Sequence, residues 1–232
     1  MKASRPANPG KHAGLPFALD TKAGLAPVKS QHVPVEIERV ILAGPRGLAL
    51  HHAGKIIAAA GLLKRRNVTW LPLFSPTVRG ESDHCTVLVS KEQIGSPLAG
   101  VPDIVLALAL ADYELFKLRI KAGGLMLYDS SAIELLPEAF RDDIRTIAVP
   151  AREMARDTGD VRLAGMVMLG AYLGSSRLLD EKSVHEALKR TASRDEGAPS
   201  PELTRKAVDE GHRYVRERRY MFNRYAYSIF MR

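Results

Sequence analysis

The fold is decided by the segment Val40-Ile41-Leu42-Ala43-Gly44-Pro45-Arg46-Gly47, in which a short apolar run ends in a glycine turn. A helical pattern follows the turn and continues through residues 53–60. A turn between a strand and a helix aims backbone N–H groups and the helix dipole at one point, which suits a phosphate or another anionic group. A second turn, Arg79-Gly80, follows the next apolar run. We expect both turns to meet at the carboxyl edge of a sheet, where open α/β sheets bind ligands.

Short apolar runs alternate with helical patterns along most of the chain. The runs cover residues 37–43, 67–73, 84–90, 103–109, 125–129 and 144–149. Several are apolar on both faces, which is typical of strands in a parallel sheet that is covered on both sides. Helices are expected over residues 47–63, 110–121, 132–140, 150–158, 161–174, 180–192 and 201–219. The sequence therefore predicts an α/β fold: a doubly wound, mainly parallel sheet with helices on both faces and a helical C-terminal part.

Three regions are expected along the chain. Residues 1–34 are rich in Pro, Gly, Ala and Lys and lack apolar periodicity, so we interpret them as an extended N-terminal arm. Residues 35–192 form the α/β domain. Residues 193–232 comprise a polar hinge, a C-terminal helix and a basic, aromatic tail with four of the seven tyrosines. Arginine and aromatic side chains are enriched at protein interfaces, so docking to a neighbouring subunit is the preferred interpretation of the tail. Nucleic acid or a lipid surface is the alternative.

Composition places the chain among globular proteins. It has 232 residues, 46% of them hydrophobic. No apolar run approaches the roughly 20 residues that span a bilayer, and the first ten residues lack a secretory apolar segment. The single cysteine, Cys85, excludes an internal disulfide and a cluster ligated by several cysteines of this chain. A reducing, cytoplasmic location is the expectation.

The net charge of +8 is concentrated at the two ends. Residues 1–34 carry five cationic side chains against one acid, and residues 213–232 carry six arginines against one glutamate. The remaining residues, 35–212, therefore have a net charge of −1. A domain that binds nucleic acid more often carries its charge on the folded face, so nucleic acid is an unlikely partner.

Further motifs follow the glycine turn in a fixed order. They are Ala53-Gly54-Lys55, Asn67-Val68-Thr69, Arg79-Gly80, Val87-Leu88-Val89-Ser90, Ile94-Gly95-Ser96-Pro97, Pro102-Asp103-Ile104, Lys121-Ala122-Gly123-Gly124, Val149-Pro150-Ala151 and Met166-Val167-Met168-Leu169-Gly170. In this order and spacing, residues 36–190 resemble the gamma subunit of the 2-oxoacid:acceptor oxidoreductases, which are thiamine-diphosphate and iron–sulfur enzymes.

The resemblance implies a subunit of a multi-subunit enzyme that oxidatively decarboxylates a 2-oxoacid to its acyl-CoA and passes electrons to ferredoxin or a similar acceptor. Thiamine diphosphate and iron–sulfur clusters would lie on partner subunits, and this chain alone would bind no cofactor. It would close the active site and help to position coenzyme A at a subunit junction. The cofactor-binding positions that the resemblance implies are Gly44, Arg46, Gly47, Arg79 and Gly80.

The glycine turn departs from the family pattern. Arg46, Leu48 and Ala49 stand where the family has glycine, glutamine and glycine, Glu81 replaces the second glycine of the second turn, and Gly165 replaces an asparagine. Side chains at these positions leave less room for a ligand phosphate to approach the backbone, although an arginine can itself bind phosphate. We expect weakened contact with coenzyme A. The alternative is a purely structural turn in which Arg46 faces solvent or a carboxylate of a partner.

A stand-alone nucleotide-binding enzyme is the second hypothesis, and a basic-tailed scaffold or nucleic-acid-associated protein is the third. A dinucleotide fingerprint requires a third glycine in the turn and an acidic residue at the end of the second strand. The glycine turn lacks that third glycine, and the second run ends in Leu73-Phe74 without an acid. Arg79 suits an anionic ligand, or it pairs with Glu81 or Asp83.

We expect no metal site and no catalytic residue. His51 and His52 diverge on a helix, and His84 and Cys85 point to opposite faces of a strand. For Ser130 or Ser131 we expect a role as a helix N-cap rather than as a nucleophile.

Overall fold

The structure is a computed structural model that describes residues 36–73, 83–98, 100–135, 140–191 and 199–229; beyond Glu217 only the backbone is described. Among the described residues, no helix is both long and apolar enough to cross a membrane.

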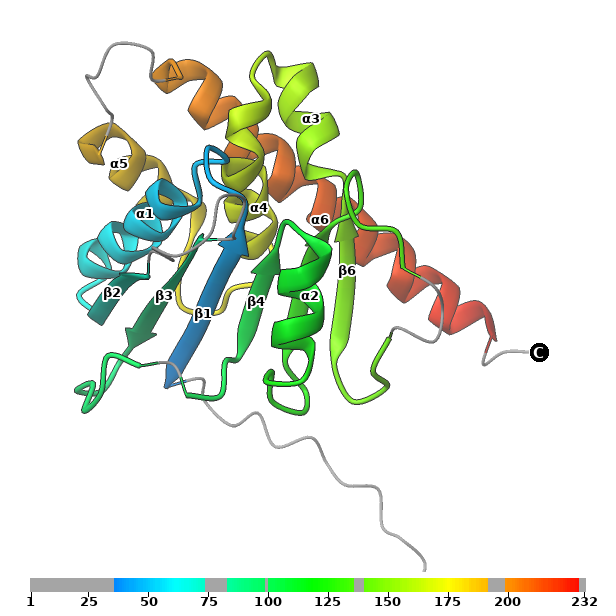
Figure 1. The fold of residues 1–232 in the computed structure, drawn as a ribbon, viewed down its shortest axis with the longest axis horizontal. Helices are drawn as coiled ribbons and strands as arrows, with labels where there is room; N and C mark the ends of the chain where they lie inside the picture. Colours follow the sequence, from blue (N-terminus) through cyan, green and yellow to red (C-terminus); the bar gives the residue numbers. More distant parts are fainter. Residues whose placement is uncertain (1–35, 74–82, 99, 136–139, 192–198, 230–232) are drawn as a thin grey trace, which may run out of the picture. The chain divides into compact units, whose positions relative to one another are not determined.

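One sheet organises the described part of the chain (Figure 1). Its strands lie in the order β2-β3-β1-β4-β5-β6. Their bounds are Ile37–Gly44 (β1), Asn67–Leu73 (β2), Asp83–Ser90 (β3), Ile104–Ala107 (β4), Leu125–Asp129 (β5) and Arg145–Val149 (β6). Strands β1, β4, β5 and β6 pair in parallel, whereas β3 runs antiparallel to both of its neighbours. The mainly parallel sheet is confirmed, and β3 is the exception that the apolar runs did not reveal.

Helices cover the two faces of the sheet unequally. Their bounds are Leu50–Leu63 (α1), Leu110–Lys117 (α2), Ala151–Thr158 (α3), Ala164–Leu173 (α4), Glu181–Thr191 (α5) and Pro201–Ile229 (α6). In Figure 1, α2 lies in front of the sheet and α6 passes behind it. The core on the side of α6 also holds residues of α1, α3, α4 and α5, whereas the core on the other side draws its helical residues from α2.

Alternation along the strands explains how one sheet feeds two cores. Val40 and Leu42 of β1 lie in the core with α1 and α4, while Ile41 and Ala43 lie in the core with α2. All four residues of β4 and all five of β5 are buried. Side chains of a strand point alternately to opposite faces, so a strand that is covered on both sides must be apolar throughout. This is the pattern from which the fold was predicted.

A buried carboxylate ties the start of β1 to the end of α4. Glu38 is 4% exposed and accepts hydrogen bonds from the Tyr172 hydroxyl at 2.6 Å, the Ser176 hydroxyl at 2.8 Å and the Arg177 backbone N–H at 2.8 Å. Burial and the neighbouring Glu38 carboxylate hold the pKa of Tyr172 well above its usual value. A buried charge is costly unless it is hydrogen-bonded, and these three donors meet that need.

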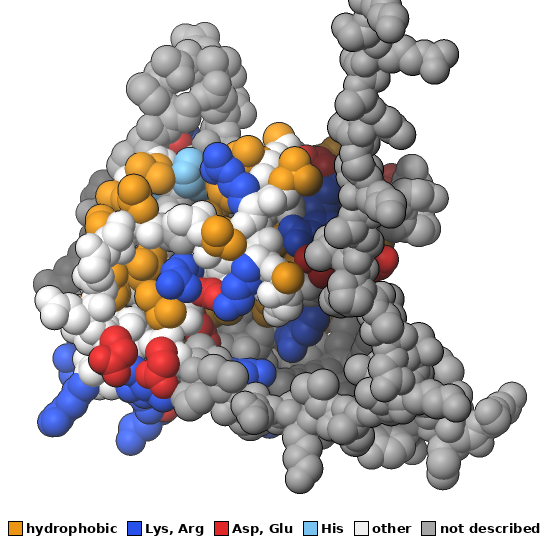
Figure 2. All heavy atoms as spheres, turned by 90° about the horizontal axis from the view of Figure 1, so that it is seen from below, with side chains coloured by type: hydrophobic (Ala, Val, Ile, Leu, Met, Phe, Trp, Pro, Cys, Tyr) orange, Lys and Arg blue, Asp and Glu red, His pale blue; other side chains and the backbone are white. Residues whose placement is uncertain are grey.

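The same end of the sheet, where the parallel strands begin, also carries ion pairs. Asp103 pairs with Lys121 and, at 3.2 Å, with Arg39. Figure 2 views the molecule from below and shows Lys and Arg side chains scattered among hydrophobic ones rather than in one continuous patch. On this face, the charge pattern resembles an ordinary mixed surface more than a nucleic-acid groove.

Several predicted helix bounds are wrong. Helix α1 begins at Leu50 rather than at residue 47, because Gly47 and Ala49 have positive φ angles of 84° and 56°. The helix predicted over residues 132–140 is absent from its described part, residues 132–135 and 140. Helix α2 ends at Lys117, before the predicted residue 121. Helix α6 runs to Ile229, ten residues beyond its predicted end, because residues 220–229 contain no glycine or proline that would end it.

The predicted helix termini at Asp180 and Gly174 are confirmed. The Asp180 carboxylate accepts from the Ser183 backbone N–H at 2.8 Å, and the Ser183 hydroxyl accepts from the Asp180 backbone N–H at 3.3 Å. This is a reciprocal cap of the start of α5. Gly174 is the C-cap residue of α4.

Candidate functional site

The glycine turn joins the carboxyl end of β1 to α1. Each of its two glycines is required for a different structural reason. A Cβ atom at Gly44 would lie 2.7 Å from the Leu108 Cβ atom and 2.9 Å from the Leu50 Cδ1 atom, so the packing under the turn excludes a side chain. At Gly47 a Cβ atom would meet nothing within 4 Å, but the φ angle of 84° favours glycine. Both predicted glycines are therefore required by the turn itself.

The N-terminus of α1 opens at this turn without a side-chain cap. Its N-cap residue is Ala49, which has a left-handed backbone, and the first turn contains no acidic residue. The first N–H groups of a helix lack acceptors within the helix, and the dipole makes this end partly positive. The turn thus keeps the feature that attracts an anion.

Arg46 bonds a carboxylate of its own chain. Its Nε atom lies 2.9 Å from Oδ2 of Asp83, the first residue of β3, which pairs with Gly44 in the sheet. The Arg46 side chain is 61% exposed and that of Asp83 is 10% exposed. The expectation that Arg46 faces solvent or a partner's carboxylate is thus incomplete, because an acid in the same chain already engages it.

A cleft of about 320 Å³ lies over the turn. It is lined by residues 45–52 together with Asp83, Arg162 and Pro199. Arg162 is a second cation at this cleft, and it bonds Asp160 with its Nε atom at 2.9 Å and with its terminal nitrogen at 2.6 Å. Since a carboxylate engages each arginine, the cleft is only weakly cationic. It suits a single anionic group better than a strongly charged ligand.

Arg162 was missed by the sequence analysis. It lies in the 3-10 turn Val161–Leu163 that precedes α4, more than a hundred residues from the glycine turn. An Asp-x-Arg spacing before a helix carries no signal of its own. Only the packing of α4 against the turn brings this residue to the cleft.

Gly165 shows how closely α4 packs on the turn. Its backbone N–H donates to the Leu48 carbonyl at 2.9 Å, and a Cβ atom at this position would lie 2.3 Å from that carbonyl oxygen. The glycine at position 165, where the resemblance leads us to expect asparagine, is therefore a steric requirement of this turn. Leu48 and Ala49, which depart from the family pattern, therefore pack directly against Gly165.

Of the predicted site residues, Arg79 and Gly80 lie outside the described residues. The residues that flank them, Leu73 at the end of β2 and Asp83 at the start of β3, lie at the edge where β1 ends, because Leu73 pairs with His84 and Gly44 with Asp83. The meeting of the two turns stays a prediction.

Asp129, the last residue of β5, links the carboxyl end of that strand to the start of α3, which follows β6. Its side chain is fully buried and accepts from the backbone N–H groups of Ala151 at 2.9 Å and Arg152 at 3.3 Å, at the start of α3. The Ser131 hydroxyl accepts from the Glu153 N–H at 3.2 Å. Ser131 is therefore not an N-cap residue as expected, because the N-cap of α3 is Pro150, but its hydroxyl accepts from an N–H group in the first turn of α3.

A second hollow of about 230 Å³ adjoins the first through Ala49, His52 and Pro199. It lies among α1, α5 and the start of α6, and its wall is mostly apolar. Burial lowers the pKa of His52, which lines both hollows. No nucleophile paired with a base lines either hollow in the described part of the chain.

Comparisons with known proteins agree with this architecture. Residues 39–214 match the family described as pyruvate ferredoxin/flavodoxin oxidoreductase. The chain is 36% identical over 154 residues to the ketoisovalerate oxidoreductase subunit VorA of Methanothermobacter thermautotrophicus; the match covers 66% of this chain and 31% of that protein. It is 27% identical over 157 residues to the 2-oxoglutarate synthase subunit KorC of Methanocaldococcus jannaschii, covering 65% and 81%. The chain thus spans only about a third of VorA.

Solved structures share the fold. The gamma subunit of a keto/oxoacid ferredoxin oxidoreductase from Geobacter sulfurreducens aligns with a TM-score of 0.64 and 24% identity, over 77% of this chain and 98% of that one. The 2-oxoglutarate:ferredoxin oxidoreductase from Magnetococcus marinus, solved with 2-oxoglutarate, coenzyme A and succinyl-CoA bound, aligns with a TM-score of 0.69 and 22% identity, over 78% and 31%. With most of its described fold inside the matched region, the chain belongs to the pyruvate ferredoxin/flavodoxin oxidoreductase family.

Proposed function

We propose that this chain is the gamma-type subunit or domain of a 2-oxoacid:acceptor oxidoreductase complex, which converts a 2-oxoacid to its acyl-CoA by oxidative decarboxylation and passes electrons to ferredoxin or a similar acceptor. The observation that carries the proposal is the family match over residues 39–214. This range includes the glycine turn and the whole sheet except the first two residues of β1. The names of the relatives VorA and KorC support a 2-oxoacid as the substrate class.

The catalytic cofactors belong on partner subunits in this proposal. The one cysteine, Cys85, is fully buried, and burial raises its thiol pKa to about 12. An iron–sulfur cluster is held by several cysteine thiolates, so this chain cannot supply the ligands by itself. The partners are therefore a thiamine-diphosphate-binding subunit and an iron–sulfur subunit, and a reduced Cys85 agrees with a cytoplasmic location.

We place coenzyme A at the cleft over the glycine turn, at a junction with a partner. The Magnetococcus relative binds coenzyme A, and the uncapped N-terminus of α1 with Arg46 and Arg162 offers donors for one phosphate group. The residues that would hold it are Gly44, Arg46, Gly47, Arg79 and Gly80, with Arg162 added from the structure. Because Asp83 and Asp160 already engage the two arginines, this contact is weak, and a partner would supply most of the affinity.

Isolation of the chain from its own organism tests the proposal. The chain is tagged at its chromosomal locus and purified without oxygen, and the proteins that accompany it are identified by mass spectrometry. We expect a thiamine-diphosphate-binding protein and an iron–sulfur protein in stoichiometric amounts, with reduction of a viologen dye that requires both a 2-oxoacid and coenzyme A. A chain recovered alone and without this activity would refute the proposal.

A further inference from the structure

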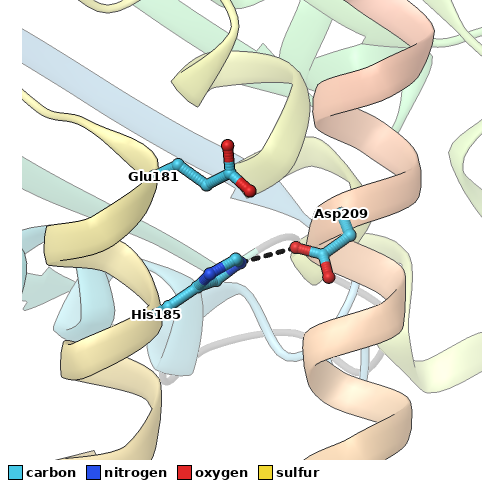
Figure 3. A group of neighbouring side chains, drawn as sticks. All are labelled: Glu181, His185 and Asp209. Atoms are coloured by element: carbon cyan, nitrogen blue, oxygen red, sulfur yellow. Dashed lines mark hydrogen bonds and ion pairs between the residues drawn. The ribbon is translucent and has the colours of Figure 1, made fainter.

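A mixed set of metal-binding side chains lies between α5 and α6, away from the glycine turn. Glu181 and His185 stand one helical turn apart on α5, and Asp209 faces them from α6 (Figure 3). The His185 Nε2 atom lies 2.6 Å from Oδ1 of Asp209, and one donor atom from each of the three residues lies within 4.8 Å of the others. Figure 3 shows the three side chains pointing toward one another across the gap between the helices.

The residue types suit a first-row transition metal. Imidazole nitrogen binds Zn²⁺ at about 2.0–2.1 Å and carboxylate oxygen at about 2.0–2.2 Å, and three protein ligands with one open position are typical of reactive zinc sites. Donor atoms around a tetrahedral ion of this size stand roughly 3.4 Å apart. The present separations are therefore near to those that a bound ion requires, and only small side-chain rotations are needed.

Glu181 is the residue that would move. Its side chain is 52% exposed, and its ion pair with the His212 Nδ1 atom is long, at 3.8 Å. A half-exposed glutamate can rotate at low cost, whereas His185 is only 18% exposed and is held by Asp209. Closing by Glu181 would complete the set without any backbone shift.

The neighbouring residues orient the other ligands. The Arg205 Nε atom lies 3.5 Å from Oδ2 of Asp209, so Oδ1 of that carboxylate is the oxygen directed to the cluster. His212 stands beside Glu181 from the next turn of α6. Hydrogen-bonding partners of this kind commonly fix the ligands of metal sites.

A hydrogen bond between His185 and Asp209 without any ion is the competing explanation. It accounts for that pair, whereas Glu181 is held only by its long ion pair with His212, at 3.8 Å, and its carboxylate lies within 4.8 Å of the same imidazole. Two carboxylates that converge on one ring repel each other unless a cation lies among them. We propose that Glu181, His185 and Asp209 bind one divalent first-row transition metal ion, Zn²⁺ in the first place, that links α5 to α6.

The sequence contains the signal for this site, but it is weak. A Glu-x-x-x-His spacing puts both side chains on one face of a helix, and the Asp-x-x-His of residues 209–212 does the same on the next helix. Such spacings are frequent on charged helices. Only the contact between α5 and α6 makes them a set, and His185 in addition lines the hollow beside it.

The test is Zn²⁺ binding to the full chain, prepared without a histidine tag and stripped with a chelator. Isothermal titration gives the stoichiometry and affinity, and Co²⁺ absorption reports the coordination. We expect one Zn²⁺ per chain and a binding constant at least tenfold weaker in each of Glu181→Gln, His185→Gln and Asp209→Asn. Zn²⁺ should raise the melting temperature of the unaltered chain, because a ligand that binds only the folded state stabilises it.

Glu186→Gln is the matched control. Glu186 follows His185 on α5 and pairs with Arg190 at 2.9 Å, so its loss removes one carboxylate from the same helix without touching the cluster. Its Zn²⁺ affinity should be unchanged. Glu181→Gln keeps the test decisive if His185→Gln fails to fold, because the exposed Glu181 side chain contributes little to packing. Absence of stoichiometric Zn²⁺ binding, or binding that Glu181→Gln leaves intact, would overturn the proposal.

Discussion

Arg46 brings two opposing effects to the glycine turn. Its side chain crowds the backbone where the family resemblance leads us to expect a phosphate, yet a guanidinium can bind a phosphate directly. The contact with Asp83 weighs against direct binding, because a ligand would have to compete with a carboxylate only 2.9 Å away. We therefore favour weakened contact with coenzyme A at this turn.

Replacing Arg46 by glycine in the assembled complex measures this balance. We expect Arg46→Gly to leave the apparent affinity for coenzyme A unchanged or to increase it, since the substitution removes the crowding side chain together with a charge that Asp83 already engages. Steady-state kinetics against coenzyme A concentration give the affinity, and Arg190→Gln, at the far end of α5, controls for the loss of one positive charge. A tenfold loss with Arg46→Gly, about 1.4 kcal/mol, would mean that Arg46 makes a strong contact with the ligand rather than the weak one proposed here.

At this scale the sequence located the turn but not the contacts that define it. The need for glycine at position 47 follows from the local pattern of the turn, whereas glycine at position 44 is required by packing against Leu108. The partner of Arg46 does not, because Asp83 reaches it only through the antiparallel pairing of β3 with β1. From the sequence, Gly165 is only a replacement of the family's asparagine. The structure gives the reason for glycine, because α4 packs against the Leu48 carbonyl at this position.

Helices α4 and α6 approach each other so closely that their backbones meet at two glycines. A Cβ atom at Gly211 would lie 1.9 Å from the Val167 carbonyl oxygen, and one at Gly170 would lie 2.0 Å from the Val208 carbonyl oxygen. The two glycines thus face each other's helix across the crossing. All ten residues of α4 are buried, so the crossing is part of the main core.

Gly211→Ala should therefore destabilise the chain although alanine is the better helix former. The gain in helix propensity is about 1 kcal/mol, while forcing the helices apart costs more than this, so we expect a net loss on the order of 2 kcal/mol in the free energy of unfolding. Urea denaturation measures it. Gly95→Ala is the control, because a Cβ atom there meets nothing within 4 Å and should cost nothing. Equal stability of the two variants would contradict the packing argument.

Elements were predicted best where burial fixes the pattern. Strand β5 has the predicted bounds because four consecutive buried apolar residues followed by Asp129 are typical of a strand that is covered on both faces. The helix expected over residues 132–140 does not form in its described part. The backbone N–H groups of Ala132 and Ile133 instead donate to the Asp129 carbonyl in a turn that follows β5. The end of α6 was misplaced because an arginine- and tyrosine-rich stretch was read as a tail, although it contains no helix breaker.

For the molecule as a whole, partly buried histidines make the stability of the fold depend on pH. Burial lowers the pKa of His52 and of His84 below 6.5. The unfolded chain then binds more protons than the folded chain between 6.5 and the lowered values, so stability is fully present above about pH 6.5 and is lost as the pH falls through that window.

We therefore expect a lower urea midpoint at pH 5.5 than at pH 7.5. His84→Gln should reduce this difference, because it removes one of the three histidines whose pKa burial lowers, which are His52, His84 and His212. Asp180, whose pKa is lowered to about 2 chiefly by its bond with Lys64, does not titrate in this range. A midpoint that stays constant or rises on acidification would contradict the assignment.

Helix α6 contains residues that stabilise the fold and, further along, residues that we expect to bind a partner. Val215 is 3% exposed and Tyr214 packs against the main core, so the helix belongs to the core at least to this point. Within the basic segment of residues 213–232, Tyr214 and Val215 thus serve the core, and we expect the docking side chains to lie beyond them. Residues 218–232 contain four arginines and most of the tail's aromatic residues, a composition that favours an interface.

Two truncations distinguish folding from docking. Deleting residues 218–232 should leave the free energy of unfolding of the isolated chain unchanged but release it from the complex, because the core residues remain and the interface side chains are lost. Deleting residues 213–232 removes Val215 as well and should cost on the order of 2 kcal/mol in stability. Denaturation of the isolated chains and co-purification with the partners measure the two effects. If the complex survives removal of residues 218–232, the tail is not the docking element, and the partner must bind elsewhere on the α/β fold.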